Sequence, residues 1–220
     1  MIGRFFRRGD TGADLPSERG PLDLAIGHAV EIDTLGLSAD LASGDPAMGV
    51  PTGGPFVVAA HGEATLDADT VLHRYYDDDH RLLQVLVPPG GGMADVQDVS
   101  LYAPWDSVAP MGQAEWDRWT GWDGLIGQPE YDADGILFCR YWGDGPDRVP
   151  LVEFTEKVDD GSACREIHQR CMLYSRPVGA GEEMLLLNIE RDLARDSRHE
   201  GGSIEFMIGY GLGPADIRKI

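Results

Sequence analysis

Lysine is almost absent from this chain of 220 residues, and positive charge is scarce altogether. The sequence has 18 basic and 38 acidic side chains, which gives a formal charge of −20. Its lysines are Lys157 and Lys219, and the arginines are scattered, mostly beside Asp or Glu. Nucleic-acid binding needs clustered cations that displace counterions from phosphate. The composition therefore argues against a nucleic-acid binder and favours a basic protein partner.

Cysteine is also rare, and long apolar runs are missing. The three cysteines, Cys139, Cys164 and Cys171, have no Cys-x-x-Cys pairing and no histidine at zinc-finger spacing. We therefore expect reduced, mostly buried thiols in a cytoplasmic protein. No stretch of about 20 apolar residues occurs, so the sequence predicts no transmembrane segment. The N-terminus also lacks the apolar run of a secretory signal.

Signatures of catalysis and of cofactor binding are missing too. No serine stands in a Gly-x-Ser-x-Gly elbow, and the six histidines show no His-x-x-x-His spacing. The sequence has no dinucleotide-binding fingerprint and no phosphate loop with its lysine. We therefore expect no catalytic residue and no cofactor.

Two acidic segments resemble metal sites without completing one. Glu130–Gly135 has the alternating carboxylates and the glycine of a calcium loop, but Tyr141 occupies the twelfth position, where a bidentate Glu is needed. The run Asp77–Asp79 lies between His73 and His80, yet adjacent side chains of a strand point to opposite faces. A turn is the better interpretation of each segment, and we expect no metal.

Short strands at hairpin spacing dominate the remaining pattern. Alternating apolar residues form three predicted hairpins, 71–76 with 81–87, 136–142 with 149–157, and 165–176 with 183–190. The best helix candidate is Gln113–Thr120, ended by Gly121. The sequence thus predicts a mainly β (α+β) fold, in which antiparallel hairpins form a sandwich or open barrel with a few short helices. We expect each sheet to bury one face and to expose the other, charged face to water.

The same pattern predicts the domain limits and the core. Residues 1–21 are expected to form a flexible tip and linker, and residues 22–220 a single β-rich domain. The Arg-aromatic segment 72–78 matches 138–144, which indicates either pseudo-repeat halves, 22–110 and 111–220, or a chance similarity. The predicted core includes Ile26, Val57, Leu83, Val85, Phe138, Leu151, Leu187 and Phe206.

The N-terminal tip reverses the charge of the rest of the chain, because it has three arginines and no acid in its first eight residues. Phe5 and Phe6 would form one amphipathic turn with these arginines and make a weak contact between residues 1–8 and a membrane surface or a partner groove. The alternative is a frayed tail, because one turn of helix is marginal by itself.

Tryptophan is concentrated between Trp105 and Trp122. Trp116, Trp119 and Trp122 recur every three residues, with acidic residues between them. Such spacing is typical of an aromatic face that packs a helix onto a sheet. The alternative is a ligand or partner site, in which the rings bind a sugar or a cation beside the carboxylates.

Several of these segments together resemble a known family. The opening apolar strand 24–35, the hairpin 72–87, the Trp-rich middle and the segment 136–158 resemble the YjfK-like bacterial proteins of unknown function. This resemblance implies no activity and no catalytic residues. Members of such families tend to be encoded near membrane-stress proteins of the phage-shock type, which implies a cytoplasmic or membrane-adjacent accessory role.

We therefore expect a non-enzymatic accessory protein that recognises a protein partner, either basic or membrane-associated. The sequence features behind this expectation are the acidic surface, the tryptophan cluster and the Arg-rich tip. The alternative is a small-ligand-binding domain or a hydrolase that uses the Trp-rich region 105–122.

Overall fold

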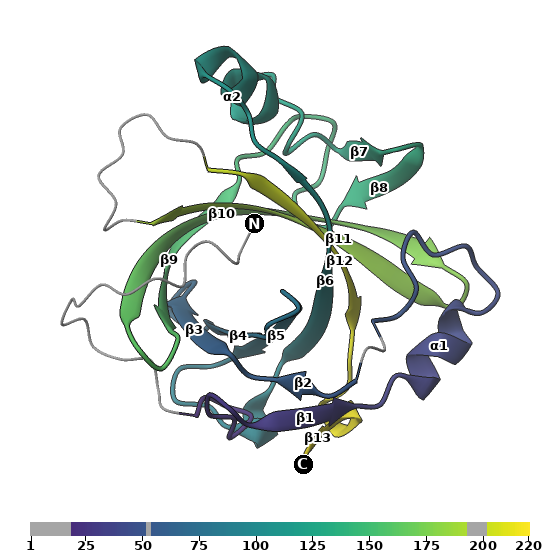
Figure 1. Cartoon of the computed structure of the whole chain (residues 1–220). Coiled ribbons are helices and arrows are strands. Elements are labelled where there is room, and N and C mark those ends of the chain that lie inside the picture. The colour runs from purple at the N-terminus through teal and green to yellow at the C-terminus, as the bar shows by residue number, and fades with distance from the viewer. Residues whose placement is uncertain (1–18, 52–53, 193–201) are drawn as a thin grey trace.

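The computed structural model describes residues 19–51, 54–192 and 202–220 (Figure 1). In this part of the chain, strands make up 47% of the residues and helices 11%. These fractions confirm the predicted mainly β fold. The predicted tip with Phe5 and Phe6, and most of the predicted linker, lie outside the described residues.

The central feature is a closed antiparallel barrel of eight strands (Figure 1). The strand order is β11-β12-β6-β5-β4-β3-β9-β10, and β10 pairs back onto β11 to close the ring. Their bounds are β3 Ala60–Thr65, β4 Val71–Tyr76, β5 Leu82–Val87, β6 Asp98–Val108, β9 Val152–Asp159, β10 Cys164–Val178, β11 Gly181–Asp192 and β12 Ile204–Gly211. Closure removes the open sheet edges that would otherwise pair with other chains.

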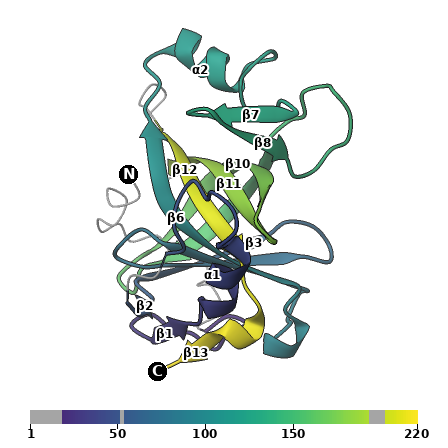
Figure 2. The ribbon, with the colours of Figure 1, turned by 90° about the vertical axis from the view of Figure 1, so that its right-hand side faces the viewer.

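Smaller elements cover the outside of the barrel. A three-stranded sheet, β13-β1-β2, joins β13 (Ile217–Lys219), β1 (Ala29–Ile32) and β2 (Phe56–Val57). The hairpin of β7 (Glu130–Ala133) and β8 (Ile136–Arg140) pairs with β10. The helices are α1 (Leu35–Leu41) and α2 (Gln113–Thr120), and the 3₁₀ turns are η2 (Met93–Asp95) and η3 (Pro214–Asp216). Figure 2 shows α2 and β7-β8 at the opposite end of the molecule from β13-β1-β2.

Three apolar clusters stabilise this arrangement. One lies inside the barrel, since its members come from all eight barrel strands, for example Leu72, Leu82 and Met207. A second packs the β13-β1-β2 sheet against the outer face of β4, β5 and β6. The third packs α1, α2 and the β7-β8 hairpin against the outer face of β10, β11 and β12. The barrel wall is therefore buried on both faces along much of its length.

Most of the predicted core is buried, but two positions are wrong. Leu83, Val85, Phe138, Leu151, Leu187 and Phe206 are all buried. Val57, in contrast, is 43% exposed, because the alternation in β2 turns its neighbour Phe56 inward instead. Ile26 is only half-buried and packs at the margin of the cluster under β13-β1-β2.

Two of the three predicted hairpins are confirmed. The pairing of 71–76 with 81–87 is the β4-β5 hairpin, and that of 165–176 with 183–190 is the β10-β11 hairpin. The pairing of 136–142 with 149–157 is wrong, because β8 pairs with β7 and β10, and β9 pairs with β3 and β10. Arg140 explains the difference. Its guanidinium donates to the carbonyls of Gly127, Trp142, Gly143, Gly145 and Asp147 and holds the segment as a wide loop.

Candidate functional site

The tryptophan segment is built around α2, whose helix matches the predicted bounds. Gly112, with φ of 80°, directly precedes the helix. At the other end, Gly121 N donates to Asp117 O at 2.8 Å and closes the last turn. Trp116 and Trp119 are half-buried and pack against the apolar cluster outside β10–β12. The ring of Trp119 meets Phe206 edge-on, with centroids 5.9 Å apart. These two side chains anchor the helix on the barrel.

The structure separates the four predicted tryptophans into two groups. Trp105, on β6, packs against the same cluster as Trp116 and Trp119. Trp122 does not join them, and 90% of its surface is exposed. The spacing of three residues ends with the helix, because Gly121 leaves the helical conformation. The indole of Trp122 is therefore presented to solvent.

The chain around Trp122 is held in place by hydrogen bonds on both sides. Leu125 N donates to Arg118 O and Ile126 N to Trp119 O, each at 3.0 Å. Arg148 reaches back from a later loop and donates through Nε to Ile126 O at 2.8 Å. Because the turn is tied to α2 and to this loop, Trp122 stands on a defined support.

Acidic side chains accompany these aromatic residues. Glu115, Asp117 and Asp123 are all exposed. Glu115 accepts a hydrogen bond from Met111 N at 2.6 Å, and Asp117 accepts one from Gln113 Nε2 at 2.8 Å. Asp123 follows Trp122 directly in the chain. Three exposed carboxylates and one exposed cation, Arg118, therefore lie on the same segment as the indole.

A second group of polar side chains lies inside the barrel, and sequence reasoning missed it. Arg74 on β4 is 2% exposed and Glu156 on β9 is fully buried. Arg74 Nη1 and Glu156 Oε2 are 3.4 Å apart, and Tyr76 donates its hydroxyl to Glu156 Oε1 at 2.7 Å. Gly62 makes this possible, since a Cβ there would lie 1.8 Å from Glu156 Oε1.

Gln169 continues the interior network from β10 toward β11. Its Nε2 donates to Glu156 Oε2 at 2.8 Å and lies 3.4 Å from Glu190 Oε1. Asn188 Nδ2 donates to the same Glu190 oxygen at 2.9 Å, while Cys171 Sγ lies 2.7 Å from Asn188 Oδ1. Gln169 Oε1 is buried and has no hydrogen-bond partner among the residues that the structure describes. The amide must be oriented this way, because its oxygen would otherwise face two carboxylates.

The electrostatics of this network follow from burial. Burial lowers the pKa of the Arg74 guanidinium, yet the acidic groups around it raise the pKa above its ordinary value, so Arg74 stays charged. Burial and then the negative charge of Glu156 raise the pKa of the Glu190 carboxyl to about 7. Burial likewise raises the pKa of the Cys171 thiol. A buried, neutral thiol of this kind is a weak nucleophile.

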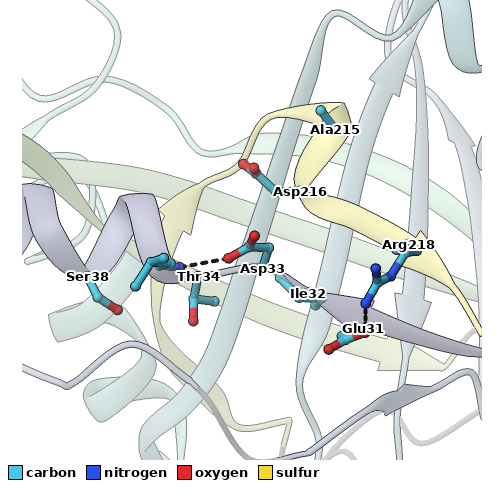
Figure 3. A pocket seen from close by; sticks show the side chains of 9 residues that line it. Glu31, Ile32, Asp33, Thr34, Ser38, Ala215, Asp216 and Arg218 are labelled. Atoms are coloured by element: carbon cyan, nitrogen blue, oxygen red, sulfur yellow. Dashed lines mark hydrogen bonds and ion pairs between the residues drawn. The ribbon is translucent and has the colours of Figure 1, made fainter.

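A surface pocket of about 460 Å³ lies where β1, the start of α1 and η3-β13 meet (Figure 3). Its charged groups take part in local structure: Glu31 pairs with Arg218, and Asp33 Oδ1 accepts a hydrogen bond from Leu35 N at 3.0 Å. Asp33 N in turn donates to Asp216 O at 2.8 Å. All nine lining residues are exposed or half-exposed, so the pocket holds no buried polar group to orient a ligand.

The two acidic segments that resemble metal sites belong to hairpins: Asp77–Asp79 lies in the turn between β4 and β5, and Glu130–Gly135 comprises β7 and the turn that follows it. Arg81 Nε donates to Asp77 Oδ2 at 2.6 Å, and Asp77 Oδ1 accepts a hydrogen bond from the backbone N–H of Asp79. These two bonds close the turn between β4 and β5. Asp132 Oδ1 accepts Gly135 N at 2.7 Å in the β7-β8 hairpin. Across the described ranges, no group of three His, Cys, Asp or Glu residues is placed to hold a metal ion. Of the three cysteines, Cys139 is exposed, and Cys164 and Cys171 are buried.

Comparison with known families identifies one match, which covers residues 1–218 and is described as a protein of unknown function (DUF2491). The chain belongs to this family. No curated protein and no solved structure matches it. The expectation of an uncharacterised family is thereby confirmed, while the narrower YjfK-like resemblance stays a prediction.

The residues described by the structure include no helix that is long and apolar enough to cross a membrane.

Proposed function

We propose that this DUF2491 protein is a non-enzymatic accessory protein that binds a basic segment of a protein partner at the α2 end of its barrel. The observation that carries the proposal is the 90% exposure of Trp122 on a turn anchored by its neighbours. Large aromatic side chains on fixed supports are frequent energetic centres of protein interfaces, because they bury much area with little loss of side-chain entropy.

Charge supports a basic partner rather than an acidic or neutral one. Glu115, Asp117 and Asp123 are exposed on the same segment as Trp122, and the formal charge of the whole chain is −20. Negative potential of this kind steers cationic partners toward the surface. An arginine placed over the face of Trp122 would gain a cation–π contact, while neighbouring carboxylates accept its N–H groups.

A binding measurement tests the proposal. The probe is a short fluorescent peptide of alternating Arg and Ser, compared with the same peptide carrying Glu in place of Arg. We expect Trp122→Ala to weaken binding of the Arg peptide at least roughly tenfold. The matched control is Leu35→Ala, since Leu35 is also exposed, at 78%, but lies on α1 away from α2 (Figure 1).

In cells, the same comparison uses a photo-crosslinking amino acid at position 122 or at position 35. A protein partner predicts one discrete adduct from position 122, joined through a basic segment that mass spectrometry identifies. Equal binding of the Arg peptide by the wild type and Trp122→Ala, together with the same adducts from both positions, would contradict the proposal.

The link to the membrane is the finer part of the proposal. The family resemblance supports a role beside bacterial membrane-stress proteins, with Phe5 and Phe6 making a weak contact with the membrane surface. Replacing both with Ser should move the protein from the membrane fraction to the soluble fraction, since the contact depends on burying apolar side chains. Thermal stability should stay unchanged. Identical fractionation of both proteins would contradict this part and leave the Trp122 site standing.

A further inference from the structure

The interior network has more acceptors than donors. Two carboxylates, Glu156 and Glu190, share the amide donor of Gln169, and the guanidinium of Arg74 contacts only the first of them. The remaining amide oxygen, Gln169 Oε1, is buried and finds no partner in the described part of the chain, and Gln169 is 1% exposed. A buried acceptor with no donor is unfavourable, so the network is one hydrogen-bond donor short.

A proton on one carboxylate would reduce the excess of acceptors in the network, because it turns an acceptor into a donor and removes one negative charge. Glu156 is poorly placed to carry it, since both its oxygens already accept hydrogen bonds from Arg74, Tyr76 and Gln169. Among the described residues, those that donate to Glu190 are Gln169 and Asn188, and both reach the same oxygen, Oε1. It is therefore the better proton carrier of the two.

Glu190 also lies on the seam that closes the barrel. It pairs in register with Gln169 across β10 and β11. The charged and titratable groups that act on it come from the surrounding strands, namely Glu156 from β9, Arg74 and Tyr76 from β4, Cys171 from β10 and Glu205 from β12. A second ionised carboxylate at this place would face Glu156 across the interior, with one guanidinium to offset both.

We propose that the barrel interior holds an exchangeable proton on Glu190, and that loss of this proton loosens the β10-β11 seam. Burial and the nearby charge of Glu156 raise the pKa of Glu190 to about 7, which agrees with this assignment. Glu190 as a whole residue is half-buried, and its carboxyl lies deep enough for burial to raise its pKa. The barrel would then respond to small pH changes near neutrality, independently of the proposed site at Trp122.

The direction of the pH effect follows from linkage. The pKa of Glu190 is higher in the folded protein, about 7, than its ordinary value of 4.5. The folded state therefore holds the proton more tightly, and stability falls as pH rises between 4.5 and 7. For one proton, the unfolding equilibrium constant increases by up to about tenfold per pH unit in this range and then levels off.

Denaturant unfolding of the full chain at a series of pH values provides the test. We expect Glu190→Gln to abolish this part of the pH dependence, because the amide imitates the protonated carboxyl and cannot ionise. The matched control is Glu166→Gln on β10, an exposed residue of the same strand pair, which should keep the wild-type slope. Parallel stability curves for the wild type and Glu190→Gln would overturn the proposal.

Two measurements on the wild-type protein test the proposal even if the Glu190→Gln variant does not fold. The infrared carbonyl band of a protonated carboxylic acid should be present below neutrality and disappear as the pH rises through about 7. Amide hydrogen exchange, corrected for its intrinsic pH dependence, should accelerate in β10 and β11 more than in β4 and β5. Loss of the band well below neutrality, or equal exchange changes in both strand pairs, would contradict the proposal.

Discussion

The barrel interior and the α2 end of the molecule differ in which side chains they bury and which they expose. Inside, Arg74 and Glu156 are charged groups withdrawn almost completely from water. At the α2 end, Trp122 is a large apolar group left almost completely in water. Neither arrangement is favourable for folding by itself. A buried charge loses its hydration and needs a partner, and an aromatic side chain left in water forgoes the free energy that its burial would contribute.

The two regions differ in whether the chain itself supplies the missing contacts of these side chains. Every charged group inside the barrel has partners on neighbouring strands, so the interior is satisfied almost entirely within the chain. Backbone hydrogen bonds hold the residues on either side of Trp122, but its indole is 90% exposed. The interior is therefore expected to control stability, while the α2 end is expected to control binding.

The largest expected effect is loss of the interior cation. Arg74→Met leaves Glu156 charged and buried without its guanidinium and also removes the contact of Arg74 over Phe154, 5.1 Å away. We expect a loss of about 3–5 kcal/mol of unfolding free energy by denaturant titration. Adding Glu156→Gln should recover part of it, since the unpaired charge is then gone.

A surface pair of the same chemistry serves as the control for Arg74. Arg170 and Glu153 are 2.9 Å apart, but their side chains are 32% and 51% exposed. Arg170→Met should therefore lower the unfolding free energy by less than about 1 kcal/mol. Similar losses for Arg74→Met and Arg170→Met would show that the interior pair is not special.

The next largest effect concerns an anchoring tryptophan of α2. Trp119→Ala removes the edge contact with Phe206 and opens space above the barrel wall. Because Trp119 is only half-buried, we expect a loss of about 2–3 kcal/mol, below the range for fully buried aromatic residues. If the Trp119→Ala protein were fully stable but no longer bound its partner, Trp119 would be a binding residue and not an anchor of α2.

Much of the fold was predictable because its strongest signals are local. The β4-β5 and β10-β11 hairpins join segments that are neighbours in sequence, and their alternation and turns indicate the pairing. The pairing of β9 with β3 joins Lys157 to Glu63, and no local pattern indicates it. The wide loop shaped by Arg140 was missed for a similar reason, since its contacts are with backbone carbonyls rather than with a recognisable side-chain motif.

The interior network was hidden by the assumption that one face of each strand is solvated. In β4, five consecutive residues, Leu72–Tyr76, are buried, because the closed barrel fills its inner face and other elements cover its outer face. Arg74 shares its face with Leu72 and Tyr76 and could have been noticed as a cation on an apolar face. Glu156 and Gln169 could not, since only the barrel closure brings their strands around Arg74.

The spacing of the tryptophans was informative only as far as the helix extends. It correctly indicated that Trp116 and Trp119 share a face, and the structure places both against the same cluster. It groups Trp122 with them although the predicted helix ends at Gly121, where the backbone becomes extended, so the helical period does not reach Trp122. The residue that carries the proposed function is thus the one for which the periodicity failed.

The smallest expected change in stability belongs to Trp122 itself. The indole is 90% exposed, so Trp122→Ala removes little buried area and should change the unfolding free energy by less than about 0.5 kcal/mol. Asp123→Lys should be equally mild for stability, but it should weaken binding of the Arg peptide and make the remaining binding less sensitive to salt. Both variants are measured by denaturant titration and by peptide binding on the same preparations. A large stability loss in Trp122→Ala would assign the indole to the support of α2, and the contrast between a stabilising interior and a binding end would no longer hold.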